Sequence, residues 1–232
     1  MTAHRFVLVL FVGALVSIGA LGNAGAEPLT PAAVWAMPRD FMEHFHARCD
    51  AHGGQEFADC FVAAMQQNDA SPEAITFARR MGGEAYLRRL DPMGKIAVAY
   101  AVFPFRANEN EAWFLVNGTP DMVAVDDLTT LPVGAIQASA GYRAMRSHAA
   151  GEVTLWPGDR NVIAQPGFIG TAGGGETFLV TYRLRDGCHA CALLGFAKFE
   201  FAFDRDGNFR GARFISVFPV TPPDKKPSIS TP

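Results

Sequence analysis

The segment 177–217 alternates apolar and polar side chains over two successive runs, and this period restricts the fold more than any other sequence feature. The first run places on one face the apolar residues Phe178, Val180, Tyr182 and Leu184. The second run does the same with Ala197, Phe199, Phe201 and Phe203. Successive side chains of a strand point to opposite faces, whereas a helix would spread these phenylalanines around its circumference. We therefore predict three antiparallel strands, the third of them the apolar run that ends near Val217.

The turn between the last two strands is predicted at 204–208, where the sequence reads Asp-Arg-Asp-Gly-Asn. Asp-Gly is a strong hairpin signal, because glycine adopts positive φ without steric cost. The spacing of the acids also resembles the start of a calcium loop. Such a loop requires glycine at its sixth position and glutamate at its twelfth, and Phe209 and Ile215 stand there instead. A plain hairpin is therefore expected.

The first turn contains the motif Cys188-His189-Ala190-Cys191. Residues three apart in a turn lie within disulfide reach, so we expect a disulfide that fixes the turn. The alternatives are a redox pair, with His189 between its two thiols, and a thiolate metal site. Thiol–disulfide enzymes place such a pair at the start of a helix, which lowers the pKa of the first thiol, and here a strand follows. Haem attachment would need histidine directly after the second cysteine, where Ala192 stands.

The N-terminal part has helical periodicity, with apolar residues three and four apart. We predict helices at about 39–49, at about 57–67 and at 71–81. The third helix begins with Ser71-Pro72-Glu73, a capping signature, and Gly82-Gly83 ends it. Cys49 and Cys60 fall at the end of the first helix and near the start of the second. A structural disulfide between them would join the two helices.

The first 26 residues have the pattern of a bacterial export signal: one arginine, an apolar run over 6–21, and Ala24 and Ala26 at the cleavage positions. We expect cleavage after Ala26 and a periplasmic or secreted protein. Four cysteines, an even number, agree with that compartment. The residues after Ala26 contain 20 − 1 = 19 basic and 23 acidic side chains, spread along the chain. We therefore expect no nucleic-acid groove, no polybasic membrane patch and no membrane span after cleavage.

Between the helices and the final strands, the sequence predicts shorter strands near 96–105, 112–116, 122–125 and 153–156, with connections too short for parallel crossovers. The segment 132–150 is ambiguous and is assigned to a helix. The predicted fold class is α+β: an N-terminal helical layer on mainly antiparallel meanders. We expect one domain over 27–218, helical in 27–92 and mainly β in 93–218, and a disordered proline-rich tail over 219–232.

Other candidate sites have ordinary structural interpretations. His44, His46, Cys49 and His52 are close in sequence, but histidines two apart on a helix point to nearly opposite sides. The phenylalanines 199, 201 and 203 could line an apolar ligand wall, although core packing is the commoner role. The glycines 173–175 lack the lysine and hydroxyl residue of a phosphate loop. We expect no metal and no cofactor.

Two functional hypotheses remain from the sequence. The first is an exported, non-enzymatic binding, inhibitory or envelope-accessory protein that is stabilised by the disulfides Cys49–Cys60 and Cys188–Cys191. Its partner would be another protein or a small apolar ligand. The second is an exported thiol–disulfide redox protein that uses Cys188, Cys191 and His189.

Overall fold

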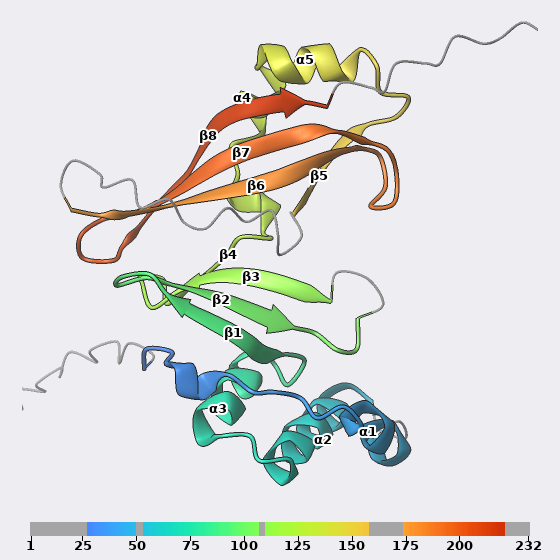
Figure 1. Ribbon diagram of the computed structural model, residues 1–232, viewed down its shortest axis with the longest axis vertical. Helices are drawn as coiled ribbons and strands as arrows, with labels where there is room; N and C mark the ends of the chain where they lie inside the picture. The colour runs from blue at the N-terminus through green and yellow to red at the C-terminus, as the bar shows by residue number, and fades with distance from the viewer. Residues whose placement is uncertain (1–26, 50–52, 107–109, 158–173, 221–232) are drawn as a thin grey trace, which may run out of the picture.

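A computed structural model describes residues 27–49, 53–106, 110–157 and 174–220. These residues form five α-helices, two short 3-10 helices (η1 and η2) and two four-stranded antiparallel sheets. Figure 1 shows helices α1–α3 on one side of the first sheet, the second sheet on its other side, and α5 at the far end of the molecule. The predicted α+β class is confirmed. The predicted export signal, His52 and most of the predicted tail lie outside the described residues.

The N-terminal helices lie close to their predicted positions. They are η1 (Pro31–Ala33), α1 (Phe41–Cys49), α2 (Gly54–Gln67) and α3 (Pro72–Arg80). Ser71 caps α3, because its hydroxyl accepts the backbone N–H of Ala74 at 3.0 Å. Gly82 and Gly83 then adopt positive φ, which ends the helix. In the part of the chain that the structure describes, no helix is long and apolar enough to cross a membrane.

The first sheet has the strand order β1-β2-β3-β4. Its strands are β1 (Tyr86–Pro92), β2 (Ala97–Val102), β3 (Glu111–Val116) and β4 (Met122–Ala124). One face contains small residues of β2 and packs with Ala33 of η1 and Phe77 of α3. Strand β1 was not predicted, and it lies within the segment assigned to the helical part. Its register shifts between Leu87 and Arg89, and this bulge breaks the period of two that would have indicated a strand.

The second sheet has the order β5-β6-β7-β8. Its strands are β5 (Val153–Pro157), β6 (Glu176–Asp186), β7 (Leu193–Phe203) and β8 (Phe209–Pro219). The prediction of three antiparallel strands in this segment is confirmed, and β8 continues to the first residue of the predicted tail. At the β7–β8 turn, Gly207 has φ +84°. The side chain and backbone of Asn208 donate to Asp204 and hold the pKa of that carboxyl well below its usual value.

The aromatic face of the second sheet packs toward the first sheet. Phe199 and Phe201 are fully buried and belong to one core cluster with Val98, Tyr100 and Leu115 of the first sheet. The alternation predicted from the sequence therefore separates a buried face from an outer face. The rings of Phe199, Phe201 and Phe203 are shielded from water only if another layer covers this face. The first sheet provides that layer.

Two buried polar groups fix the second sheet to the rest of the chain. The Tyr182 hydroxyl donates to the carbonyl oxygen of Val125. Burial raises the pKa of Tyr182 well above its usual value, so the hydroxyl remains a donor over the ordinary pH range. The Glu176 carboxylate accepts the backbone N–H of Lys95 at 2.6 Å and that of Ile96 at 3.0 Å. Both contacts join the β5–β8 sheet to segments before it in the chain.

The segment between the sheets contains η2 (Leu128–Thr130), α4 (Val133–Gln137) and α5 (Ala140–Arg146). It supplies Ile136 and Met145 to the core. A Cβ added at Gly195 would lie 3.0 Å from Met145 Sδ. Gly195 is on the inner side of β7, so α5 packs toward the inner side and not over the outer face. The ambiguous assignment of 132–150 to a helix agrees with these two short helices.

Candidate functional site

The Cys49–Cys60 disulfide joins α1 to α2, with a Cα–Cα distance of 6.0 Å. Cys49 is fully buried, and Cys60 packs against the same core. Cys60 is half-buried, and the bond lies between two packed helices. Its geometry is that of a structural link.

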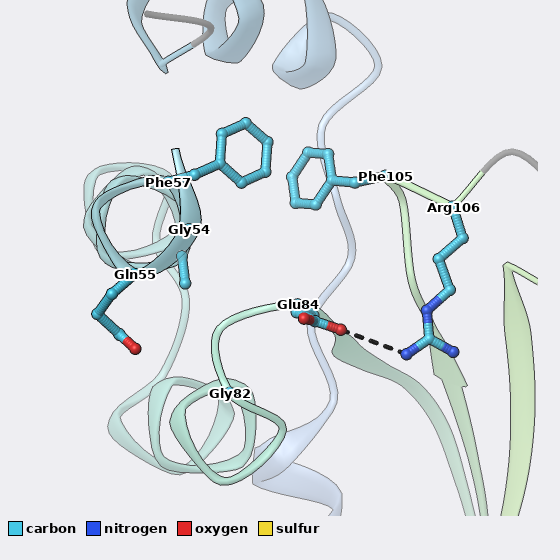
Figure 2. Close-up of a pocket in the computed structure, with 8 residues that line it drawn as sticks. Gly54, Gln55, Phe57, Gly82, Glu84, Phe105 and Arg106 are labelled. Atoms are coloured by element: carbon cyan, nitrogen blue, oxygen red, sulfur yellow. Dashed lines mark hydrogen bonds and ion pairs between the residues drawn. The ribbon is translucent and has the colours of Figure 1, made fainter. Parts of the chain in front are cut away.

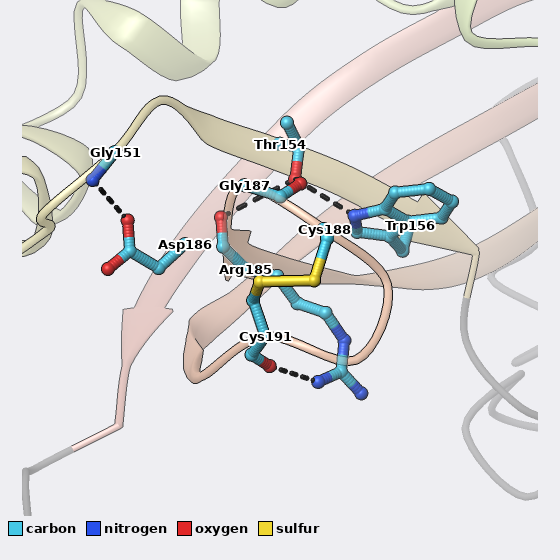
Figure 3. The surroundings of a disulfide bond; sticks show 8 residues. All are labelled: Gly151, Thr154, Trp156, Arg185, Asp186, Gly187, Cys188 and Cys191. Atoms are coloured by element: carbon cyan, nitrogen blue, oxygen red, sulfur yellow. Dashed lines mark hydrogen bonds between the residues drawn. A yellow bond between two sulfur atoms is a disulfide. The ribbon is translucent and has the colours of Figure 1, made fainter.

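The Cys188–Cys191 disulfide closes the turn between β6 and β7, with a Cα–Cα distance of 5.0 Å. The backbone N–H of Cys191 donates to the carbonyl oxygen of Cys188 at 3.0 Å, which defines a tight turn. Cys188, His189 and Ala190 are exposed, while Cys191 is half-buried. The bond is therefore accessible at the tip of a hairpin (Figure 3).

Side chains of β5 and β6 support this turn (Figure 3). Arg185 Nη1 donates to the carbonyl oxygen of Cys191 at 2.7 Å. The Thr154 hydroxyl donates to the carbonyl oxygen of Gly187 at 2.5 Å, and Trp156 Nε1 donates to Thr154 Oγ1 at 2.8 Å. The Trp156 ring contacts His189 edge-on, with ring centroids 5.2 Å apart. The turn and the end of β5 therefore form one hydrogen-bonded unit.

The Cys188–Cys191 disulfide is exposed, but it does not lie at the start of a helix, the element that activates a thiol. A strand, β7, begins two residues after Cys191, and none of the described helices begins at this turn. The nearby guanidinium of Arg185 is occupied by a carbonyl oxygen of the turn. These hydrogen bonds fix the conformation of the turn, which is what a structural disulfide requires and not what activates a thiol.

The outer face of the second sheet aligns residues from all four strands in one row. The register pairs Trp156 with Arg183, Arg183 with Phe196, and Phe196 with Phe218. In the next row Lys198 pairs with Thr181 and Ser216. We call Trp156, Arg183, Phe196, Lys198 and Phe218 the outer-face patch. Paired residues of neighbouring strands project to the same side, so the patch is one continuous surface.

The outer-face patch is apolar and cationic at once. The ammonium group of Lys198 lies 5.8 Å from the centroid of the Phe218 ring, and Phe218 is 52% exposed. Arg185 lies in the row beside Arg183, on the same side of the sheet. Acids flank the patch: Glu152 precedes β5, and Glu200, one row further, forms an ion pair with Arg213 at 2.8 Å. The strand residues in these rows contain three cations and no acid.

A pocket of about 500 Å³ lies between α2 and the chain that follows β2 (Figure 2). Its apolar part contains Phe57 and Phe105, whose rings meet edge-on with centroids 4.6 Å apart. Its polar part contains Arg106, which forms an ion pair with Glu84 at 3.3 Å. The guanidinium of Arg106 also lies 3.7 Å from the centroid of the Phe103 ring. The cation is thus engaged by neighbours on both sides.

The remaining candidates from the sequence do not form a site in the described residues. The phenylalanines 199 and 201 are core, closed off by the first sheet, and do not line this pocket. His44 and His46 are exposed on α1, and His44 lies 3.6 Å from Asp40. Within the described ranges, no three histidine, cysteine or acidic side chains come together as metal ligands.

The disulfide turn was predicted from the sequence, whereas the outer-face patch was not. Arg183 and Arg185 alternate with the apolar residues of β6 and belong to its polar side. Their aromatic neighbours come from β5, β7 and β8, and only strand pairing brings these residues into one row. The signal that could have found the patch is the apolar residues at polar positions of the alternation, Phe196 and Phe218.

Comparison with known proteins gives no assignment: no family model, no curated protein and no solved structure matches this chain.

Proposed function

We propose that this protein is an exported, non-catalytic binding protein, periplasmic or secreted, that recognises an anionic macromolecule through the outer-face patch. The observation that carries the proposal is the row of paired residues that places Arg183 between Trp156 and Phe196, with Phe218 exposed at its end. Exposed apolar patches mark interaction sites. The three cations in these rows are the reason that we propose an anionic partner, since charges of opposite sign attract across an interface.

The two disulfides support the proposed location and rigidity. Disulfides persist in oxidising compartments, which agrees with the export signature at the N-terminus. The Cys188–Cys191 bond lies at one end of the outer face, where Trp156 contacts His189. A fixed turn keeps Trp156 in place before any partner binds, which reduces the entropy lost on association.

A thiol–disulfide redox function is the second candidate. The observation that favours it is the exposure of Cys188 at the tip of the hairpin. None of the described helices begins at this turn, and Arg185 donates to a carbonyl oxygen of the turn rather than to a sulfur. The structural function of this bond therefore has the stronger support.

The proposal is tested with dextran sulfate as a soluble polyanion. We expect the mature, oxidised protein to bind it saturably in isothermal titration calorimetry at low salt, and to bind more weakly as salt screens the charges. The double variant Arg183→Glu/Lys198→Glu should bind at least about tenfold more weakly, since each cation near a negative surface contributes roughly 1 kcal/mol.

The matched control is Arg79→Glu/Arg88→Glu, which changes the net charge equally at exposed positions of α3 and β1. Measured at about 0.15 M salt, where the Debye length is about 8 Å, its affinity for dextran sulfate should stay within about twofold of that of the parent protein, since both positions lie outside the second sheet. An equal loss in both variants would show that net charge alone governs binding. That result, or no binding at all, would contradict the proposal.

A further inference from the structure

Exposed apolar side chains are concentrated at one end of the second sheet. Of the six large hydrophobic side chains that are exposed in the described part of the chain, four belong to β7, to β8 or to the residue after β8. They are Leu193, Ile215, Phe218 and Val220, with exposed fractions of 36%, 36%, 52% and 37%. The exposure of these apolar side chains to water is unfavourable. A partner that covers them would therefore gain binding free energy from the burial of their apolar surface.

Three of these four side chains face the same way as the outer-face patch. Leu193 pairs with Arg185, which shares a face with Arg183. The backbone N–H of Val220 donates to the carbonyl oxygen of Leu194, so the chain continues the β8 pairing beyond Phe218. Alternation then places Val220 on the same side as Phe218. The outer-face patch thus extends into an apolar margin of Leu193, Phe218 and Val220.

We propose that the anionic partner is a phospholipid surface, and that Phe218 enters the boundary between headgroups and acyl chains. This inference rests on the proposed function. Amphipathic protein surfaces bind bilayers by combining buried apolar groups with cations that reach anionic headgroups. Lys198 beside Phe218 has the required form, because its aliphatic stem can lie along apolar surface while its ammonium group stays at headgroup level.

The apolar margin favours lipid over an anionic polysaccharide. A sugar chain could stack on Trp156 or Phe196, but it would cover aliphatic side chains such as Leu193 and Val220 without offering them an apolar environment. Acyl chains offer one. Trp156 also favours a lipid partner. Its indole N–H donates to Thr154, and a tryptophan, with an apolar ring and a polar N–H group, is typical of the membrane interface.

The experiment compares two vesicle types by co-flotation of the mature, oxidised protein. One type contains phosphatidylglycerol and phosphatidylcholine in equal parts, and the other contains phosphatidylcholine only. We expect binding to the anionic vesicles, little binding to the neutral vesicles, and a loss of binding at high salt. Each cation at the surface should change partitioning roughly fivefold.

The variants Phe218→Ser and Val220→Ser test whether apolar side chains enter the bilayer. We expect Phe218→Ser to lower partitioning into anionic vesicles about tenfold, because an apolar side chain no longer leaves water. Val220→Ser should also lower partitioning. Because Val220 lies outside the five residues of the outer-face patch, the affinity of Val220→Ser for dextran sulfate should stay within about twofold of the parent value. Unchanged circular dichroism confirms that each variant is folded.

The outcomes distinguish this inference from the proposed function. Binding to dextran sulfate without binding to anionic vesicles would overturn the lipid proposal and leave an anion-binding surface for a polysaccharide or acidic protein. Vesicle binding that Phe218→Ser does not weaken would also overturn it. Binding to neither probe would overturn both proposals.

Discussion

Replacing Phe201 by alanine should lower the free energy of unfolding by about 3–5 kcal/mol. Phe201 is fully buried in the cluster that joins the two sheets, and its ring lies 6.1 Å from that of Phe209 in a stacked arrangement. Alanine would leave a cavity between two sheets that cannot collapse without moving a paired strand. The expected loss is large against the roughly 5–15 kcal/mol that stabilises an ordinary domain.

Urea unfolding of the oxidised protein measures this loss as a lower midpoint at an unchanged slope. The matched control is Phe218→Ala, which removes the same ring from the outer face of the neighbouring strand. Because Phe218 is mostly exposed, its removal should change stability by less than about 0.5 kcal/mol. Equal costs for the two substitutions would contradict the assignment of inner and outer faces.

Removing the Cys49–Cys60 disulfide should have the second large effect. The variant Cys49→Ala/Cys60→Ala is expected to lose about 3 kcal/mol, because the closed loop no longer restricts the unfolded chain. The comparator is Cys188→Ala/Cys191→Ala, which opens a much shorter loop and should lose about 2 kcal/mol. Guanidinium unfolding without reductant measures both. A larger loss from the short loop would mean that the turn does more than close a hairpin.

The same two bonds separate the two functional candidates. In the binding protein that we propose, both disulfides are structural and should resist mild reduction, as judged by alkylation and mass spectrometry. Selective release of Cys188–Cys191, with Cys49–Cys60 retained, would favour the redox candidate instead.

The sequence allowed the second sheet to be predicted because β6 and β7 alternate buried and half-buried residues over most of their length. Phe199, Phe201 and Phe203 can share a face only in an extended chain. It did not allow β1 to be predicted, because the bulge between Leu87 and Arg89 destroys the alternation. Alternation of apolar and polar residues predicts a strand well where one face is buried along most of the strand. It predicts a strand poorly where a bulge interrupts a short strand.

The contacts between distant segments could not be predicted from the sequence. Glu176 accepts two backbone N–H groups from residues some eighty positions earlier, and nothing local to Glu176 indicates this. The outer-face patch has the same origin. Trp156, Arg183, Phe196 and Phe218 come from four strands, and their common row depends on pairings that a single sequence does not specify.

The aromatic face of the second sheet packs on the first sheet, and Arg183 and Phe196 lie on the opposite face. Nuclear Overhauser contacts of the Tyr182 ring test it most directly. The structure predicts contacts from this ring to Val125, through the hydroxyl that donates to the Val125 carbonyl, and to the ring of Phe199, 5.2 Å away between centroids. Helical contacts along residues 193–203, with none between Tyr182 and Val125, would contradict it.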